Sequence, residues 1–176
     1  MRWIVLLGLV SLAAHTAAAE ESAVDSMQLA QSQGRDVVVL PQAKSSDSVR
    51  SAFGPIHARS VETRTRRIHT VSFGGRAYRA ATPLEGPASR VAFDPRRRKF
   101  VALLSSIRVE VNNQAQVNAI AKATGATRTT YIAKLGVAFI ELPEFLHPVE
   151  AIERLKAVRG RPKGSIRLRR PPVKWL

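Results

Sequence analysis

The residues that decide the predicted fold are IRVEVNNQAQVNAIAKATGATRTTYIAKLGVAFIELPEFLHPVEAIERLKAV, at positions 107–158. Within them, residues 126–133 and 137–142 read as two extended runs, joined by three residues that end in Gly136. This pattern indicates a compact β-hairpin. The second run is apolar at consecutive positions, which is typical of a central strand that is covered on both faces.

A strand and two helices are predicted around this hairpin. Residues 107–111 alternate apolar and polar side chains, as a half-buried strand does. Asn113 is suited to cap a first helix that ends at Gly125, and Pro148 is suited to the first turn of a second helix. With a last extended stretch at 166–170, the order is β-α-β-β-α-β. This order predicts a ferredoxin-like α+β fold over residues 101–170, an antiparallel sheet with two helices on one face.

Less regular segments precede this domain. Residues 20–65 are rich in Ser, Gln and Ala, and we expect them to form a flexible N-terminal arm. Residues 66–100 contain a predicted β-hairpin followed by a basic loop. The hairpin turns at Gly74-Gly75, because glycine accepts the positive φ of such turns. In that register, Val71 faces Tyr78 across the two strands.

The first 19 residues, MRWIVLLGLVSLAAHTAAA, combine one arginine, an apolar run and a small-residue end. This combination is typical of a secretory signal peptide at 1–19. Its apolar run is shorter than the roughly 20 residues that a membrane-spanning helix needs. We therefore expect a periplasmic or secreted protein with no transmembrane segment after signal cleavage. The chain has no cysteine, so it would fold without disulfides.

Charge is the strongest compositional signal. The formal net charge is +15, and residues 50–100 hold 12 basic residues against 3 acidic ones. Such a charge attracts polyanions and acidic surfaces. Aromatic residues make up 6% of the chain, too few to favour the base-stacking surfaces of single-strand RNA readers. One hypothesis for function is therefore a cationic periplasmic binding module for a polyanion or an envelope lipid.

Patterns typical of catalysis and metal binding are absent from the sequence. His57, His69 and His147 have no second ligand residue at the spacing of a metal site, so we expect loop, hairpin and helix-cap positions for them. No nucleophile elbow or phosphate-binding loop is present. We therefore predict no catalytic residue, no metal, no cofactor and no enzymatic activity.

The stretch quoted above resembles the propeptide and inhibitor domains of subtilisin-like serine proteases, and the resemblance covers about residues 101–170. The shared features are a strand, a helix that ends in Gly125-Ala126, a strand that reaches Leu135-Gly136, an apolar strand that runs into a proline, and a helix with the pattern A-I-x-x-L. After the second helix, family members usually have a Gly-Val segment and an acidic strand. This chain is strongly basic there.

The resemblance implies a stand-alone inhibitor or an external folding chaperone of a subtilisin-like serine protease, because no protease domain follows in this sequence. In that family, the exposed face of the sheet packs on two surface helices of the protease, and the C-terminal tail enters the substrate groove. The tail of this chain is residues 171–176. Its last four residues would occupy the groove as a product mimic: Val173, Lys174, Trp175 and Leu176.

Two strings of the form Arg-x-Arg-Arg resemble the sites that kexin-like subtilases cleave. Their arginines are candidate basic contacts or cleavage sites: Arg64, Arg66, Arg67, Arg167, Arg169 and Arg170. The alternative for these strings is a purely electrostatic role on a solvated surface. A third hypothesis for the whole chain is an accessory or structural part of a secretion assembly.

Overall fold

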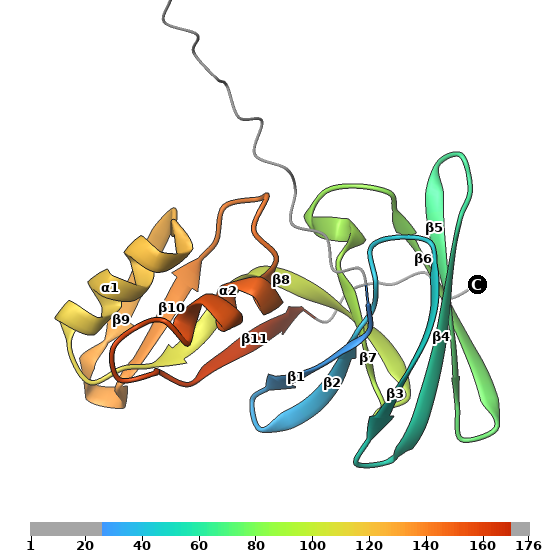
Figure 1. The fold of residues 1–176 in the computed structure, drawn as a ribbon, viewed down its shortest axis with the longest axis horizontal. Helices are drawn as coiled ribbons and strands as arrows, with labels where there is room; N and C mark the ends of the chain where they lie inside the picture. The colour runs from blue at the N-terminus through green and yellow to red at the C-terminus, as the bar shows by residue number, and fades with distance from the viewer. Residues whose placement is uncertain (1–25, 170–176) are drawn as a thin grey trace, which may run out of the picture.

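The structure is a computed structural model, and it describes residues 26–169. Eleven strands and two α-helices form this part of the chain (Figure 1). The strands are β1 (Gln28–Ser32), β2 (Arg35–Val39), β3 (Ser45–Ser51), β4 (Gly54–Glu62), β5 (Arg66–Phe73), β6 (Arg76–Pro83), β7 (Val91–Asp94), β8 (Lys99–Glu110), β9 (Arg128–Ile132), β10 (Val137–Glu141) and β11 (Gly164–Arg169). The helices are α1 (Gln114–Thr124) and α2 (Pro148–Leu155), and short 3-10 helices occur at Pro87–Ser89 and Ala133–Leu135.

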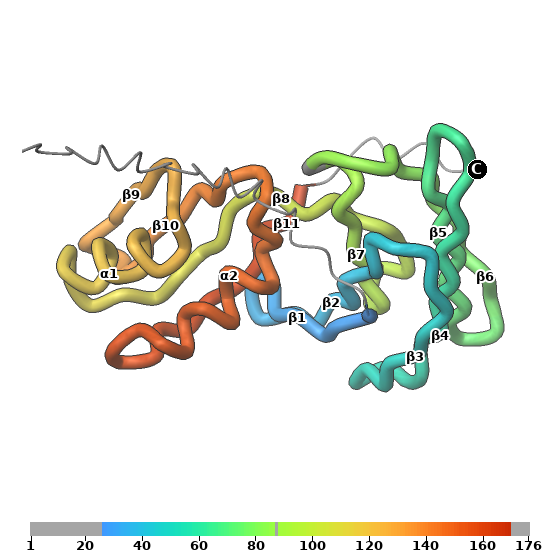
Figure 2. The backbone as a smooth tube through the Cα atoms, turned by 45° about the horizontal axis from the view of Figure 1, so that its top comes forward, coloured from blue at the N-terminus to red at the C-terminus, as the bar shows by residue number. Residues whose placement is uncertain are grey.

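The strands form two sheets that share no strand. The larger sheet has seven strands in the order β1-β2-β7-β8-β10-β9, and β11 also pairs with β8. The smaller sheet has the order β3-β4-β5-β6. β8 organises the larger sheet, because Ala102 pairs with Val91 of β7 on one edge and with Arg169 of β11 on the other. The larger sheet curls, so that β1 contacts β11 (Figure 2).

The predicted ferredoxin-like α+β fold is wrong. The chain is mostly β, and its larger sheet continues beyond β8 through β7, β2 and β1. The reason lies in residues 99–106, which directly precede the strand predicted at 107–111. These residues extend β8 to twelve residues, and their free edge pairs with β7. A second sheet then packs over Phe93 of β7 and Phe100 at the start of β8.

The flexible arm expected at 20–65 is corrected for its described part, residues 26–65. β1 pairs with β2, and β3 and β4 form half of the smaller sheet. Val37, Val38 and Val39 are fully buried. Along β3, exposed residues alternate with half-buried ones, as in a strand with one face packed inward. We predicted a flexible arm here because the residues of this strand are mostly polar.

The predicted β5–β6 hairpin is confirmed. Gly74 and Gly75 both have positive φ at its turn. Val71 pairs with Tyr78, as the turn length requires. The hairpin belongs to the smaller sheet, where β5 also pairs with β4.

The signals that start and end the helices are also confirmed. The Asn113 side chain accepts a hydrogen bond from the backbone N–H of Gln116 (2.9 Å), which caps α1. Gly125 follows α1 in the left-handed conformation, with φ of 62°. α2 begins at Pro148, and the His147 side chain caps it by accepting from the backbone N–H of Val149 (3.2 Å).

Three apolar clusters join these layers. The first lies between the two sheets and includes Ile56, Val71, Phe93 and Phe100. The second lies between the α-helices and the strands β8 and β10. The third fills the curl of the larger sheet, where Val149 of α2 packs with Leu103 and other strand residues. α2 therefore contributes to two clusters: Leu155 packs in the second and Val149 packs in the third.

Candidate functional site

The predicted site residues that the structure describes do not form one cluster. Five of the predicted site residues lie outside the described residues: Arg170, Val173, Lys174, Trp175 and Leu176. Arg64 and Arg66 are exposed at the turn into β5, and Arg167 and Arg169 lie on β11. Arg66 and Arg67 of the first string therefore belong to the smaller sheet, whereas Arg167 and Arg169 of the second belong to the larger one.

Arg67 differs from its neighbours in the first string because its side chain is buried. The guanidinium forms an ion pair with Glu62 (2.8 Å), and the Arg67 side chain is only 6% exposed. β5 is hydrogen-bonded to β4 on one edge and to β6 on the other. Cleavage after Arg67 would therefore require β5 to separate from both neighbours, so this bond is protected in the folded protein.

The best candidate for a docking surface is the face of β8–β11 that the α-helices leave uncovered. The opposite face packs on α1 and α2 through residues such as Ile107 and Ile140. On the uncovered face, Phe139 pairs with Thr130 of β9 and with Arg108 of β8. We call this surface the Phe139 face, and its residues are Arg108, Thr130, Phe139, Ser165 and Arg167.

Arg167 organises the centre of the Phe139 face. Its guanidinium carbon lies 4.8 Å from the centroid of the Phe139 ring. The same guanidinium donates a hydrogen bond from Nη1 to the Ser106 hydroxyl (3.1 Å). A cation over an aromatic ring is attracted to its face, so the two side chains hold one another in place. The alternation in the IRLRR string is the sequence signal for this placement, because Ile166 must face the core.

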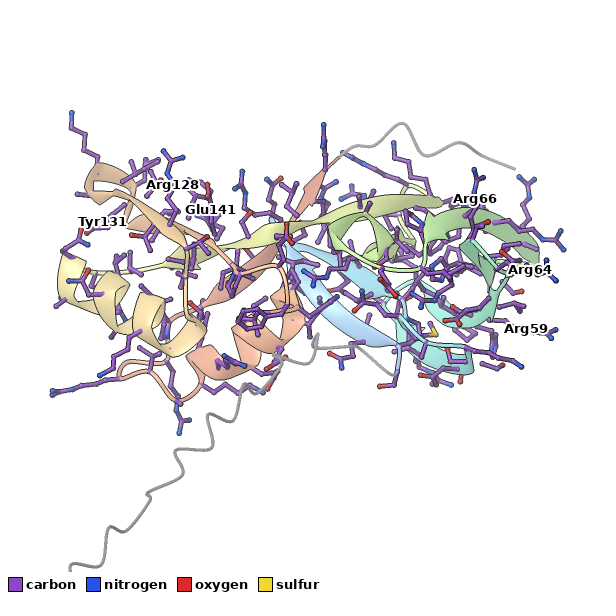
Figure 3. The ribbon with its side chains drawn as sticks, turned by 90° about the horizontal axis from the view of Figure 1, so that it is seen from above. Arg59, Arg64, Arg66, Arg128, Tyr131 and Glu141 are labelled. Carbon is purple, nitrogen blue, oxygen red and sulfur yellow. The ribbon has the colours of Figure 1, made fainter. Side chains whose placement is uncertain are left out.

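The rim of the Phe139 face combines exposed apolar and charged groups. Ile132 is 37% exposed and Leu135 is 69% exposed. Arg128 and Glu141 are cross-strand partners on β9 and β10, and Figure 3 shows them side by side. A half-buried aromatic residue with apolar and charged neighbours is a composition that suits a protein partner.

A cavity of about 440 Å³ lies at one end of this face. Its walls include three basic residues, Arg108, Arg161 and Lys163, together with the apolar Leu135. Glu110 also lines the cavity and forms an ion pair with Arg108 (3.6 Å). The cavity therefore extends the Phe139 face with a basic recess that could accept an acidic group of a docked protein.

The buried histidines have structural surroundings. His69 Nδ1 lies 2.9 Å from the Ser60 hydroxyl, and its Nε2 lies 3.2 Å from the Thr82 hydroxyl. Burial, helped by the Arg67 guanidinium, lowers the pKa of His69 to about 4. Burial and the nearby Arg90 guanidinium lower the pKa of His147 to about 4, against the opposing effect of Glu150.

His57 differs from the expected loop position, because it lies on β4 and is exposed. His69 is in the predicted hairpin and His147 is at the predicted helix cap. Within residues 26–169, no group of three or more His, Asp or Glu side chains is arranged to hold a metal ion. In this part of the chain, the histidines therefore do not form a metal site.

Comparisons with known proteins place no further restriction on this site. No family model, no curated protein and no solved structure matches the chain. In the part of the chain that the structure describes, neither helix has the length and apolar character to cross a bilayer. The hypotheses for function therefore depend on the surfaces described above and on the resemblance of residues 101–170.

Proposed function

We propose that this chain is an exported, stand-alone inhibitor or folding chaperone of a subtilisin-like serine protease, and that it docks through the Phe139 face. The observation that carries the proposal is the sheet surface opposite α1 and α2, with a half-buried Phe139 at its centre. In the protein family that residues 101–170 resemble, the corresponding face of the sheet contacts the protease. The proposal does not depend on the ferredoxin-like fold, because it needs only this face of β8–β11.

The physical properties of the Phe139 face suit such a partner. A hydrogen-bonded sheet is already ordered before binding, so docking loses little conformational entropy. Phe139, Ile132 and Leu135 offer apolar contacts. Arg108 and Arg128 offer charged contacts at the rim, where charge contributes more to specificity and association rate than to affinity.

Replacing Phe139 with aspartate should weaken inhibition of subtilisin at least tenfold. The substitution removes the central apolar contact and places a carboxylate where the partner must exclude water. The measurement is the inhibition constant against subtilisin with a peptide substrate. Because Phe139 is half-buried, circular dichroism must first show that the variant folds.

Asn118→Asp is the matched control, since Asn118 is exposed on α1, on the other side of the sheet. It should leave the inhibition constant within twofold of the wild type. Thr130→Arg, on the Phe139 face, tests the same surface without removing a buried group. Docking through this face is refuted if folded Phe139→Asp and Thr130→Arg variants both inhibit as well as the wild type.

Deleting residues 173–176 should leave the melting temperature unchanged while inhibition falls at least tenfold. The resemblance implies that these residues occupy the substrate groove of the protease, and a tenfold loss corresponds to about 1.4 kcal/mol of binding free energy. The preceding prolines, Pro171 and Pro172, would limit the entropy that an extended tail loses on binding. Equal inhibition by the truncated and full chains would mean that binding depends on the Phe139 face alone.

A further inference from the structure

A second surface lies at the other end of the molecule, on the outer face of the smaller sheet. Side chains alternate between the two faces of a strand. In β4, Ile56 and Ala58 are buried against the larger sheet, so His57 and Arg59 point outward. In β6, Ala80 is buried and Arg79 is exposed. By the same alternation, Arg50 of β3 and Arg66 of β5 belong to the outer face.

We call these four arginines, Arg50, Arg59, Arg66 and Arg79, the arginine face. Arg59 and Arg79 lie in one cross-strand row, because both pair with Thr70 of the strand between them. Two strand spacings separate them by roughly 10 Å. Arg50 lies towards one end of the sheet and Arg66 towards the other, so the four extend over roughly 27 Å along the strands. Figure 3 shows Arg59 and Arg66 at the end of the molecule that is remote from α1.

The charge of this surface is not neutralised by other residues of 26–169. None of its four arginines forms an ion pair there, whereas Arg67 on the inner face is paired with Glu62. Two acidic residues occur in β3–β6, Asp47 and Glu62. The Asp47 carboxylate accepts a hydrogen bond from the backbone N–H of Met27 (2.8 Å), on the inner side of β3. The outer face therefore carries positive charge without an acidic residue.

The side chains around the arginines indicate the chemistry of a partner. All four cations are arginines, whose planar forks match sulfate and phosphate groups. The outer positions of β3–β6 contain no Phe, Tyr or Trp, and their one aromatic ring is that of His57, so the surface lacks the row of aromatic side chains on which single-stranded nucleic acid stacks. Its larger apolar side chains, Val61 and Ile68, are half-buried within the sheet, so the face offers little apolar surface to a membrane.

Hydroxyl groups lie beside the arginines instead. They belong to residues at outer positions of β3 and β5: Ser46, Ser48, Thr70 and Ser72. Hydroxyl side chains can exchange hydrogen bonds with sugar hydroxyls. We propose that the arginine face binds an anionic polysaccharide that carries sulfate or phosphate groups. This surface is separate from the Phe139 face, so the two can be tested independently.

Binding to heparin, a sulfated polysaccharide, tests the proposal directly. The double variant Arg59→Gln/Arg79→Gln should bind about tenfold more weakly than the wild type at moderate salt. The slope of log affinity against log salt concentration should fall by about two, because each lost contact removes the release of about one counterion. Titration calorimetry at several salt concentrations measures both quantities.

The matched control is Lys122→Gln/Arg159→Gln, which removes the same charge from exposed positions outside the smaller sheet and outside the Phe139 face. It should bind heparin within twofold of the wild type. Arg59→Lys/Arg79→Lys retains the positive charge but removes the planar guanidinium groups. Its affinity for heparin should lie between those of the wild type and the glutamine double variant. All variants should melt like the wild type and should inhibit subtilisin as well as it does.

Two results would overturn the proposal. An equal loss of heparin affinity in the glutamine double variant and its control would show that binding follows total charge. Tighter wild-type binding to single-stranded oligothymidine, or to phosphatidylglycerol vesicles, than to heparin at the same salt concentration would assign the surface to another class of partner. Neither result bears on the Phe139 face, which is tested by inhibition.

Discussion

Replacing Phe93 with alanine should lower the free energy of unfolding by about 3–5 kcal/mol, close to the full stability of many small domains. Phe93 is fully buried between the two sheets. Its ring contacts those of Phe73, Tyr78 and Phe100 at centroid distances of 6.0, 5.2 and 5.5 Å. Alanine would leave a cavity at the point where both sheets meet, and the surrounding strands cannot collapse to fill it.

Chemical denaturation followed by circular dichroism measures this loss. Phe53→Ala is the matched control, because Phe53 is 53% exposed at the β3–β4 turn. Its removal should change the free energy of unfolding by less than about 0.5 kcal/mol. If Phe93→Ala and Phe53→Ala had similar small effects, the two sheets would not share a core in solution.

The second large effect is a loss of stability as the pH falls from 7 to 5. The pKa of His69 and that of His147 are each lowered to about 4 in the folded protein. In the unfolded chain, both side chains take up a proton near pH 6.5. Between these values, the unfolded state binds more protons, so acidification favours unfolding. Each histidine should contribute about 1.4 kcal/mol per pH unit in this window.

The stabilising effect of the neutral histidines is thus complete above about pH 6.5 and is lost as the pH falls towards 4. Urea denaturation at pH 7 and pH 5 measures it. His69→Gln should reduce the pH dependence by about half, because glutamine does not titrate. A stability that stays constant between pH 7 and pH 5 would show that neither histidine is buried in its neutral form.

The candidate docking surface was only partly predictable from the sequence. The alternation in the IRLRR string predicts that Arg167 faces away from the core, whereas the consecutive apolar residues around Phe139 predicted a strand covered on both faces. The 4.8 Å contact between them joins β10 to β11, two strands that do not pair with each other. The buried Arg67 shows the opposite limitation. Arg66 is exposed and Arg67 is buried, although both belong to the same string of arginines. The ion pair with Glu62, which only the structure shows, is what distinguishes Arg67.

The sequence by itself determined the local features of this protein. Asn113 and Gly125 set the ends of α1, and the Gly74-Gly75 turn set the register of β5 with β6. These signals suffice because they act through hydrogen bonds and backbone angles within a few residues. The tertiary structure alone decided that β8 pairs with β7 and that a second sheet packs over Phe93. Such pairings join residues that are far apart in the chain. Several strands have similar hydrophobic patterns, and each could form hydrogen bonds with the same edge of β8. Only the packing of the whole core selects one of them.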